Sequence, residues 1–175
     1  LKERIQLFPV NTVQDILGDD QLHARGFWQK ERIPGLEKEL RVPGPFAQIS
    51  FPRKEGAVRK REECEEDRTG LPFEGIRVAD FSWVAAAPWI TQWLAEYGAE
   101  VIKVETTTRP DATRYSGPFK DNKRGIDRSS QFLVFNGGKK SITLNLNHPE
   151  GRKIAQRLVA WADVVVESFS PGKMK

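Results

Sequence analysis

The segment from Gly75 to Glu105, GIRVADFSWVAAAPWITQWLAEYGAEVIKVE, constrains the fold of this chain more than any other. It opens with a short apolar run rich in β-branched residues, IRVADF, which is typical of a strand covered on both faces. A turn follows, then an apolar pattern at helical spacing that ends at Gly98, then a second apolar run, EVIKVE. Strand, helix and strand in this order predict two parallel strands joined by a right-handed crossover.

The same pattern returns after residue 139. KSITLNL is predicted to be a third strand, PEGRKIAQRLVAWA a second helix led by Pro149, and DVVVES a fourth strand. His148 or Asn147 must cap the second helix, and histidine is a poor cap. Residues 72–175 are therefore predicted to form an α/β domain, with a Rossmann-like, mainly parallel sheet flanked by helices.

The first predicted helix carries five large apolar side chains at helical spacing. We expect this stripe to belong to the core and not to stack on a cofactor. Pro88 is predicted at the first helical position, where its missing N–H would be unpaired in any case. Asp80 lies inside a buried strand and is predicted to be structural. The stripe comprises Trp89, Ile90, Trp93, Leu94 and Tyr97.

The turn after the first strand argues against a nicotinamide oxidoreductase. Dinucleotide-binding folds carry G-x-G-x-x-G there, whereas this chain has SWVAAAP from Ser82 to Pro88. The three alanines at 85–87 let a ligand approach the backbone closely, but Pro88 removes one N–H donor from the helix N-terminus. An NAD pyrophosphate is therefore disfavoured. Glu105, at the end of the second strand, is predicted to be a solvated acid, with a ribose hydroxyl as the alternative partner.

Basic residues are in excess between positions 106 and 140, with eight against three aspartates. Within this stretch, FNGGKKS offers Gly137 and Gly138 for a tight turn and Lys139 and Lys140 as phosphate ligands. Taken alone, both features favour solvated lysines over an anion site. Nucleic-acid binding is disfavoured because the aromatic residues occupy core-like positions and no recognised binding motif is present.

Residues 1–52 predict a short, irregular α+β segment. VNTVQDILGDD reads as a helix with a capping box from Thr12 and Asp15 and a stop at Gly18, and DDQLHARG as another helical turn. FWQKERI alternates like a strand, and RVPGPFAQISF continues as extended chain broken by prolines. The segment has too few apolar side chains for its own core, so we expect it to pack on the α/β domain.

Residues 53–71, RKEGAVRKREECEEDRTGL, predict a charged linker between the two segments. The only cysteine, Cys64, lies here, which excludes an internal disulfide and a cysteine-rich zinc site. No apolar run reaches the ~18 residues of a membrane span, and the first residues do not resemble a signal peptide. We therefore expect a cytoplasmic protein with no membrane association and no metal. The missing initiator methionine leads us to expect a fragment or a processed product.

Taken together, three stretches of residues 71–175 resemble the class III coenzyme A transferases, also called the CaiB/BaiF family. The stretches are LPFEGIRVADFSWVAAAPWITQWLAEYGAEVIKVE, RPDATR, and FNGGKKSITLNLNHPEGRKIAQRLVAWADVVVESFSPG. The family includes formyl-CoA transferase, carnitine CoA-transferase and α-methylacyl-CoA racemase. Residues 1–52 resemble the family's C-terminal stretch, placed here before its N-terminal stretch. This order implies either a piece of a tandem protein or a circular permutation, and the linker-like residues 53–71 favour the tandem.

The resemblance implies that coenzyme A contacts residues after all four strands of this chain. Several of these positions depart from better-known members: Ala85 stands where formyl-CoA transferase has Gln, Trp83 where it has His, and Thr106 where it has a basic residue. Arg109 and Arg114 lie close enough in sequence to compensate. The implied contacts are Val84, Ala85, Ala86, Thr106, Leu144, Asn147, Ser168 and Phe169.

The resemblance also implies a reaction that these residues do not complete. The family's nucleophile is an aspartate that attacks the thioester and carries the acyl group as a mixed anhydride, and it would fall after Lys175. We therefore expect the parent protein to move coenzyme A between an acyl-CoA and a carboxylic acid, and this chain alone to be inactive. Its implied partners are a second copy in a homodimer or the rest of the parent chain. The alternatives are a non-catalytic binding or dimerisation module on the same fold, and part of an acyl-CoA racemase.

Overall fold

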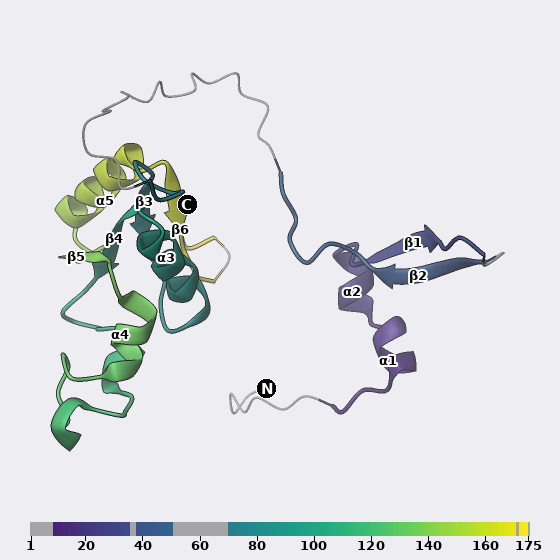
Figure 1. Cartoon of the computed structure of the whole chain (residues 1–175), viewed down its shortest axis with the longest axis horizontal. Coiled ribbons are helices and arrows are strands. Elements are labelled where there is room, and N and C mark those ends of the chain that lie inside the picture. The colour runs from purple at the N-terminus through teal and green to yellow at the C-terminus, as the bar shows by residue number, and fades with distance from the viewer. Residues whose placement is uncertain (1–8, 36–37, 51–69, 171, 175) are drawn as a thin grey trace. The chain divides into compact units, whose positions relative to one another are not determined.

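The computed structural model describes residues 9–35, 38–50, 70–170 and 172–174. The chain divides into two compact units, Leu1–Lys60 and Arg61–Lys175 (Figure 1). Within the described ranges, no helix is both long and apolar enough to cross a lipid bilayer. Cys64 and almost all of the predicted linker, residues 53–71, lie outside these ranges. The boundaries of the three predicted segments, and the packing of residues 1–52 on the α/β domain, therefore stay predictions.

The first unit contains two short helices followed by a β-hairpin. The helices are α1 (Val13–Leu17) and α2 (Asp20–Ala24), and the strands β1 (Trp28–Arg32) and β2 (Glu39–Pro43) pair antiparallel. The predicted capping box is confirmed, since the Thr12 hydroxyl accepts from the Asp15 N–H and Asp15 accepts from the Thr12 N–H. Only β2 differs from the prediction, which left that stretch merely extended.

None of the described residues of the first unit is fully buried. Two of its apolar side chains, Val13 and Phe46, are 74% and 100% exposed. A third apolar residue, Phe51, lies outside the described residues. A segment that buries so little apolar surface gains little hydrophobic stabilisation by itself.

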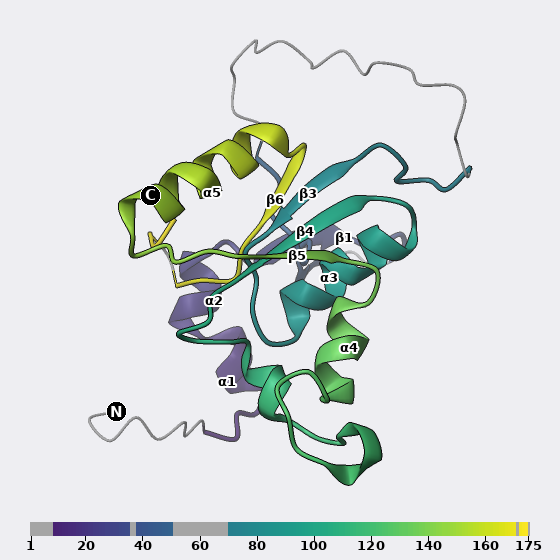
Figure 2. The ribbon, with the colours of Figure 1, turned by 90° about the vertical axis from the view of Figure 1, so that its left-hand side faces the viewer.

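The second unit is built on a four-stranded parallel sheet (Figure 2). Its strands are β3 (Arg77–Asp80), β4 (Glu100–Glu105), β5 (Lys140–Thr143) and β6 (Val164–Val166), in the spatial order β5-β4-β3-β6. All three neighbouring pairs are parallel. The predicted α/β fold with a parallel sheet flanked by helices is confirmed, with the most buried strands, β3 and β4, at its centre.

Helices cover both faces of this sheet (Figure 2). On one face, Ala79, Phe81 and Val104 pack with Ala155 and Leu158 of α5 (Pro149–Trp161). On the other, Val78 and Val101 pack with Leu94 and Ala95 of α3 (Ala86–Glu96). Successive strand residues therefore point their side chains into the cores on opposite faces of the sheet, as the pleat of a strand requires.

The connection from β4 to β5 holds further structure that the sequence analysis did not predict. It contains two 3₁₀ turns, η1 (Ala112–Tyr115) and η2 (Lys120–Asn122), and one helix, α4 (Ser130–Asn136), which packs against α3. The sequence did not reveal these elements because they are only 4, 3 and 7 residues long, too short to show a helical period.

Of the predicted core stripe of α3, Leu94 packs on the core, but the aromatic residues do not, contrary to the prediction. Trp89, Trp93 and Tyr97 are 51%, 48% and 43% exposed. The helix instead turns Pro88 and Thr91 inward. An amphipathic period shows that a helix has two faces, but small residues can fill the narrow space against a sheet, which leaves the larger face outward.

The start of α3 departs from the prediction, whereas the start of α5 agrees with it. Helix α3 begins at Ala86, so Pro88 is its third residue, a position whose N–H would still lack a partner within the helix. Helix α5 begins at Pro149 as predicted, and His148 does cap it: its Nδ1 accepts from the Glu150 N–H at 3.2 Å. At the far end of α3, Gly98 adopts a φ of +101°, which confirms it as the helix stop.

Candidate functional site

The carboxyl ends of the four parallel strands surround a pocket of about 370 Å³. Loops after β3, β4, β5 and β6 all contribute to its wall, which is where ligands bind in open parallel sheets. The wall mixes apolar rings and aliphatic chains with hydroxyls and amides. The lining residues are Phe81, Trp83, Val104, Glu105, Thr106, Thr108, Arg109, Leu144, Asn145, Leu146, Asn147, Ser168, Phe169 and Ser170.

The structure brings most of the predicted contact residues to this one pocket. Thr106, Leu144, Asn147, Ser168 and Phe169, from three different loops, all line it. The other three predicted residues, at positions 84–86, do not line the pocket and follow the lining residue Trp83 directly, at the N-terminus of α3. No side chain caps that helix start.

The loop after β3 is fastened to the loop after β6 and to buried charges. The Trp83 N–H donates to the Ser168 hydroxyl at 3.0 Å. The next peptide group, the Val84 N–H, donates to Asp111 Oδ2 at 3.2 Å, and the Ser82 carbonyl accepts from the ammonium of Lys103 at 2.9 Å. The turn is therefore held at three consecutive residues.

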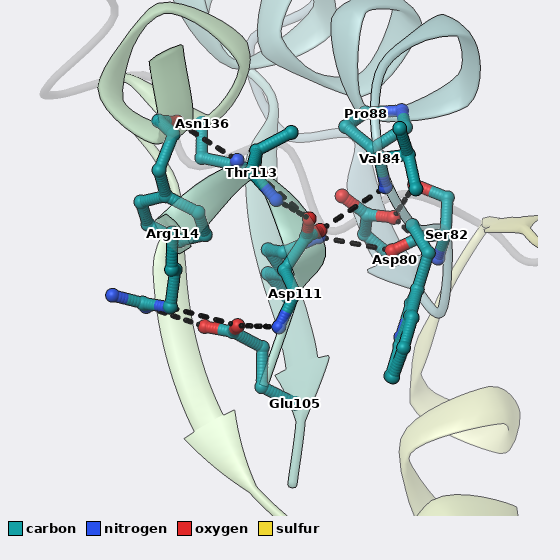
Figure 3. Close-up of polar contacts among 12 residues, drawn as sticks. Asp80, Ser82, Val84, Pro88, Glu105, Asp111, Thr113, Arg114 and Asn136 are labelled. Atoms are coloured by element: carbon teal, nitrogen blue, oxygen red, sulfur yellow. Dashed lines mark hydrogen bonds and ion pairs between the residues drawn. The ribbon is translucent and has the colours of Figure 1, made fainter. Parts of the chain in front are cut away.

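Lys103 and Asp111 form a buried ion pair beneath this turn (Figure 3 shows Asp111). Their charged atoms lie 3.3 Å apart, and their side chains are 1% and 0% exposed. The other oxygen of Asp111 accepts from the backbone and hydroxyl of Thr113 at 3.0 and 2.8 Å. Because a buried charge without such partners is costly, this pair can persist only with its full set of contacts.

Val84 shows the effect of this anchoring on the backbone. Its φ is +69°, in the left-handed region that β-branched residues rarely enter. The hydrogen bond from its N–H to Asp111 fixes that geometry. Strain held by surrounding contacts is often found at ligand sites.

A second buried pair joins Asp80 to Lys139. The Lys139 ammonium lies 2.9 Å from Asp80 Oδ2 and also donates to the Pro88 carbonyl at 2.8 Å and to Asn136 Oδ1 at 2.9 Å. It therefore ties the end of β3 to the first turn of α3 and the last residue of α4. The prediction that Asp80 is structural agrees with these contacts, whereas the prediction of a solvated Lys139 was wrong: its side chain is 2% exposed. Its neighbour Lys140 is exposed, as expected.

Burial acts on the pKa values of both residues of this pair, but it dominates only for Lys139. Burial raises the pKa of Asp80, but the Lys139 ammonium and the hydroxyls of Ser82 and Thr91 outweigh it and hold the pKa below its usual value. For Lys139 burial dominates: it lowers the pKa of the ammonium to about 8, and the Asp80 carboxylate offsets only part of the effect. At neutral pH both groups are charged.

Glu105 is not the solvated acid that was predicted. It is 8% exposed and accepts two hydrogen bonds from Arg114, at 3.0 and 2.6 Å. Arg114 also pairs with Asp127 at 2.8 Å, and its guanidinium lies 3.5 Å from the ring centroid of Phe132. The hydrogen bonds that Arg114 donates to Glu105, offset in part by burial, raise the pKa of Arg114. Arg114 is thus committed to protein partners, which weakens its case as a substitute ligand for an anion.

Arg109 has a different position. It lines the pocket, and its guanidinium carbon lies 5.1 Å from the centroid of the Trp83 ring, within the range of a cation–π contact. Of the two arginines named as compensating residues, the structure places only Arg109 on the pocket wall.

Sequence reasoning missed Lys103 and Asp111 as residues that shape the site. A signal for each was present. Lys103 interrupts the apolar run EVIKVE, and a lysine in a buried strand requires a buried anion. Asp111 precedes Thr113 by two residues, the spacing of an aspartate that hydrogen-bonds the backbone two residues on. Within the described ranges, no three His, Cys, Asp or Glu side chains are grouped so that they could hold a metal ion.

Comparison with known proteins gives this fold and site a family. The sequence profile described as CoA-transferase family III matches residues 73–175. Succinyl-CoA:glutarate CoA-transferase of Mus musculus is 40% identical over 116 residues, which are 66% of this chain and 25% of that protein. Formyl-CoA:oxalate CoA-transferase of Escherichia coli is 41% identical over 101 residues, 58% of this chain and 23% of that protein. The chain thus spans about a quarter of the length of these relatives.

A solved structure agrees with the sequence matches. A CaiB/BaiF family protein from Brucella suis superposes with a TM-score of 0.53 at 39% identity, over 59% of this chain and 27% of that one. The parallel sheet is accordingly that of a CaiB/BaiF family protein. This chain belongs to CoA-transferase family III, as the resemblance predicted.

Proposed function

We propose that the pocket at the carboxyl edge of the sheet holds coenzyme A, in a protein that transfers coenzyme A between carboxylic acids. One observation carries the proposal: five residues that the family resemblance assigned to coenzyme A, from three separate loops, line a single pocket. Its mixed wall suits a ligand that combines a nucleotide with an amide-containing arm.

The turn at residues 84–86 supplies the rest of the proposed site. Val84, Ala85 and Ala86 bring backbone and mostly small side chains to the N-terminus of α3, where no side chain makes a capping hydrogen bond. The anchoring by Lys103 and Asp111 keeps this backbone in one geometry before any ligand arrives. Such preorganisation reduces the entropic cost of binding.

The names of the relatives indicate the substrate class of the whole protein. The mouse and Escherichia coli relatives are named for succinyl-CoA and glutarate, and for formyl-CoA and oxalate. We infer that the parent protein likewise takes an acyl-CoA and a carboxylic acid, with an acyl-CoA racemase as the alternative. We further propose that these 175 residues alone bind coenzyme A without transferring it, because the resemblance places the nucleophilic aspartate beyond Lys175.

Calorimetric titration of the chain with coenzyme A, with NAD as the negative control, tests the binding proposal. We expect saturable binding of coenzyme A and none of NAD. Thr106→Glu should weaken coenzyme A binding about tenfold or more, because it adds a carboxylate to the pocket wall against a phosphorylated ligand. Thr107→Glu is the matched control. It adds the same charge one residue away, at a position that does not line the pocket.

The two substitutions separate a local effect from a general one. Equal weakening by Thr106→Glu and Thr107→Glu would indicate only long-range charge, and absence of coenzyme A binding would remove the proposal. An acyl-transfer assay on the same preparation, with succinyl-CoA and glutarate as probes, checks the expected inactivity. Measurable turnover would contradict it.

A second candidate function, assembly, is favoured by the exposed face of α3. Trp89, Ile90, Trp93 and Tyr97 stand together on that helix, with 43–57% of each exposed. Aromatic patches of this kind often mark protein interfaces. We propose that a second copy covers this face in a homodimer. Sedimentation of the chain should then show a dimer that Trp93→Ser dissociates, whereas a monomeric wild-type chain would exclude it.

A further inference from the structure

Two loops of the second unit meet at the pocket through one cation–π pair. Trp83 follows β3 and Arg109 follows β4, and both line the pocket. The guanidinium carbon of Arg109 lies 5.1 Å from the centroid of the Trp83 ring. The Trp83 N–H is held by the Ser168 hydroxyl at 3.0 Å, so the ring stands on an anchored loop.

Arg109 has no carboxylate partner within the described part of the chain. None of the nine ion pairs found there includes it. Arg114, five residues away, is fully engaged by Glu105 and Asp127. Glu105 is the acidic residue of the described pocket wall, and its oxygens are taken up by Arg114.

Arg109 is therefore the one cation among the described residues that line the pocket. An arginine stacked on an aromatic face keeps its planar N–H fork in a fixed orientation, with the N–H groups directed outward along the edge. That fork matches the oxygens of a phosphate, which it can bind with two parallel hydrogen bonds. Thr106 and Thr108, whose hydroxyls lie 3.0 Å apart on the same loop, offer further hydrogen-bonding groups nearby.

We propose that Arg109, held on the Trp83 ring, is the residue that binds a phosphate group of the nucleotide ligand and so selects phosphorylated ligands for this pocket. This inference rests on the proposed coenzyme A site and adds the residue that recognises the negative charge of the ligand. The phosphate has two possible sources within coenzyme A, the 3′-phosphate and the pyrophosphate.

Titrations of the full chain with coenzyme A, dephospho-coenzyme A and pantetheine test the proposal and distinguish the two sources. Arg109→Gln should weaken coenzyme A binding about tenfold or more, the effect of removing a charged hydrogen-bonding partner. If the 3′-phosphate is bound, the loss disappears with dephospho-coenzyme A. If the pyrophosphate is bound, the loss persists there and disappears with pantetheine.

Two matched variants control for net charge and for the ring. Arg124→Gln removes the same charge from an exposed arginine that does not line the pocket, and should change affinity less than twofold. Trp83→Leu should weaken coenzyme A binding more than Trp83→Phe, because phenylalanine keeps an aromatic face under the guanidinium. The effect of Arg109→Gln should also shrink as salt is raised.

Unchanged coenzyme A affinity in Arg109→Gln, or equal weakening of pantetheine and coenzyme A, would overturn the inference. Adenosine 3′,5′-bisphosphate separates it from the proposed function. If coenzyme A does not bind but this bisphosphate binds in an Arg109-dependent way, the phosphate site stands and the coenzyme A proposal falls. If neither ligand depends on Arg109, the phosphate site itself is excluded.

Discussion

Val84 illustrates how single residues in this protein are fixed by distant partners. Its left-handed backbone, with a φ of +69°, is not a local preference of valine and is stabilised by Asp111, 27 positions along the chain. Asp111 in turn depends on Lys103, which also holds the Ser82 carbonyl. The conformation of the turn therefore depends on a buried charge pair.

Replacing Val84 with glycine tests this strain. Glycine adopts positive φ without steric cost, and the relief of about 1 kcal/mol should offset the greater freedom of the unfolded chain. We expect the free energy of unfolding of Val84→Gly to stay within about 0.5 kcal/mol of wild type. Val134→Gly, at an exposed position inside α4, should lower it by about 1 kcal/mol. Urea unfolding measures both free energies, and an equal loss of stability in the two variants would contradict strain at Val84.

The lowered pKa of Lys139 predicts a pH dependence with a defined sign. Between about pH 8 and the ordinary value of 10.5, the unfolded chain holds a proton on Lys139 that the folded chain has released. The free energy of unfolding should therefore rise with pH in this window because of this group. We expect the stability difference between wild type and Lys139→Met to grow from pH 8 to pH 10 by chemical unfolding. The exposed substitution Gln156→Ala provides the baseline, and a flat or shrinking difference would contradict the shift.

At the scale of elements, α5 is set unusually close to the loop that follows β5. An added Cβ at Gly151 would lie 2.1 Å from the carbonyl oxygen of Asn145. That carbonyl belongs to the Asn145–Asn147 loop, which lines the pocket. The glycine is thus required by the contact between helix and loop, although its helix propensity is poor.

Gly151→Ala should therefore destabilise the protein. Helix propensity alone would favour alanine by about 1 kcal/mol, but the clash with backbone should outweigh it and cost about 1–3 kcal/mol overall. Gln156→Ala, at an exposed position of the same helix, should stay within about 0.5 kcal/mol of wild type. Thermal and urea unfolding would measure both, and a Gly151→Ala variant more stable than wild type would refute the close contact.

Sequence patterns predicted the long elements of the second unit but not the short ones. All four strands of the sheet and both long helices were predicted from runs of apolar residues and their periods. Helix α4 and the two 3₁₀ turns were not, because such short elements show no such period. The aromatic stripe of α3 was assigned to the wrong environment, since periodicity identifies a face of a helix and not what covers it.

At the scale of the whole molecule, the two core clusters are built entirely from residues of the second unit. No described residue of the first unit is fully buried. We therefore predict that residues 70–175, expressed alone, unfold cooperatively and bind coenzyme A with the affinity of the full chain.

The same comparison tests the proposed division of the chain. Residues 1–60 alone should show no cooperative unfolding, because none of the residues described in this range is fully buried. Calorimetry of the two pieces and of the full chain gives the result. A marked loss of stability in residues 70–175 would mean that the first segment contributes to their core, as the expected packing of residues 1–52 on the domain implies.

The sequence by itself determined the order of strands and helices, their parallel arrangement and the family. It also pointed to five of the residues that line the pocket. These follow from local runs of apolar residues, turn residues and the rule that the carboxyl ends of parallel strands lie at one edge of the sheet.

Only the tertiary structure decided the partners of the buried charges. Asp80 and Lys139 are 59 positions apart, and nothing local pairs them. The tertiary structure likewise decided that Arg114 forms an ion pair with Glu105, whereas Arg109 lies on the pocket wall. The physical reason is that an ion pair depends on distance in space, which the chain's path sets and local sequence does not encode.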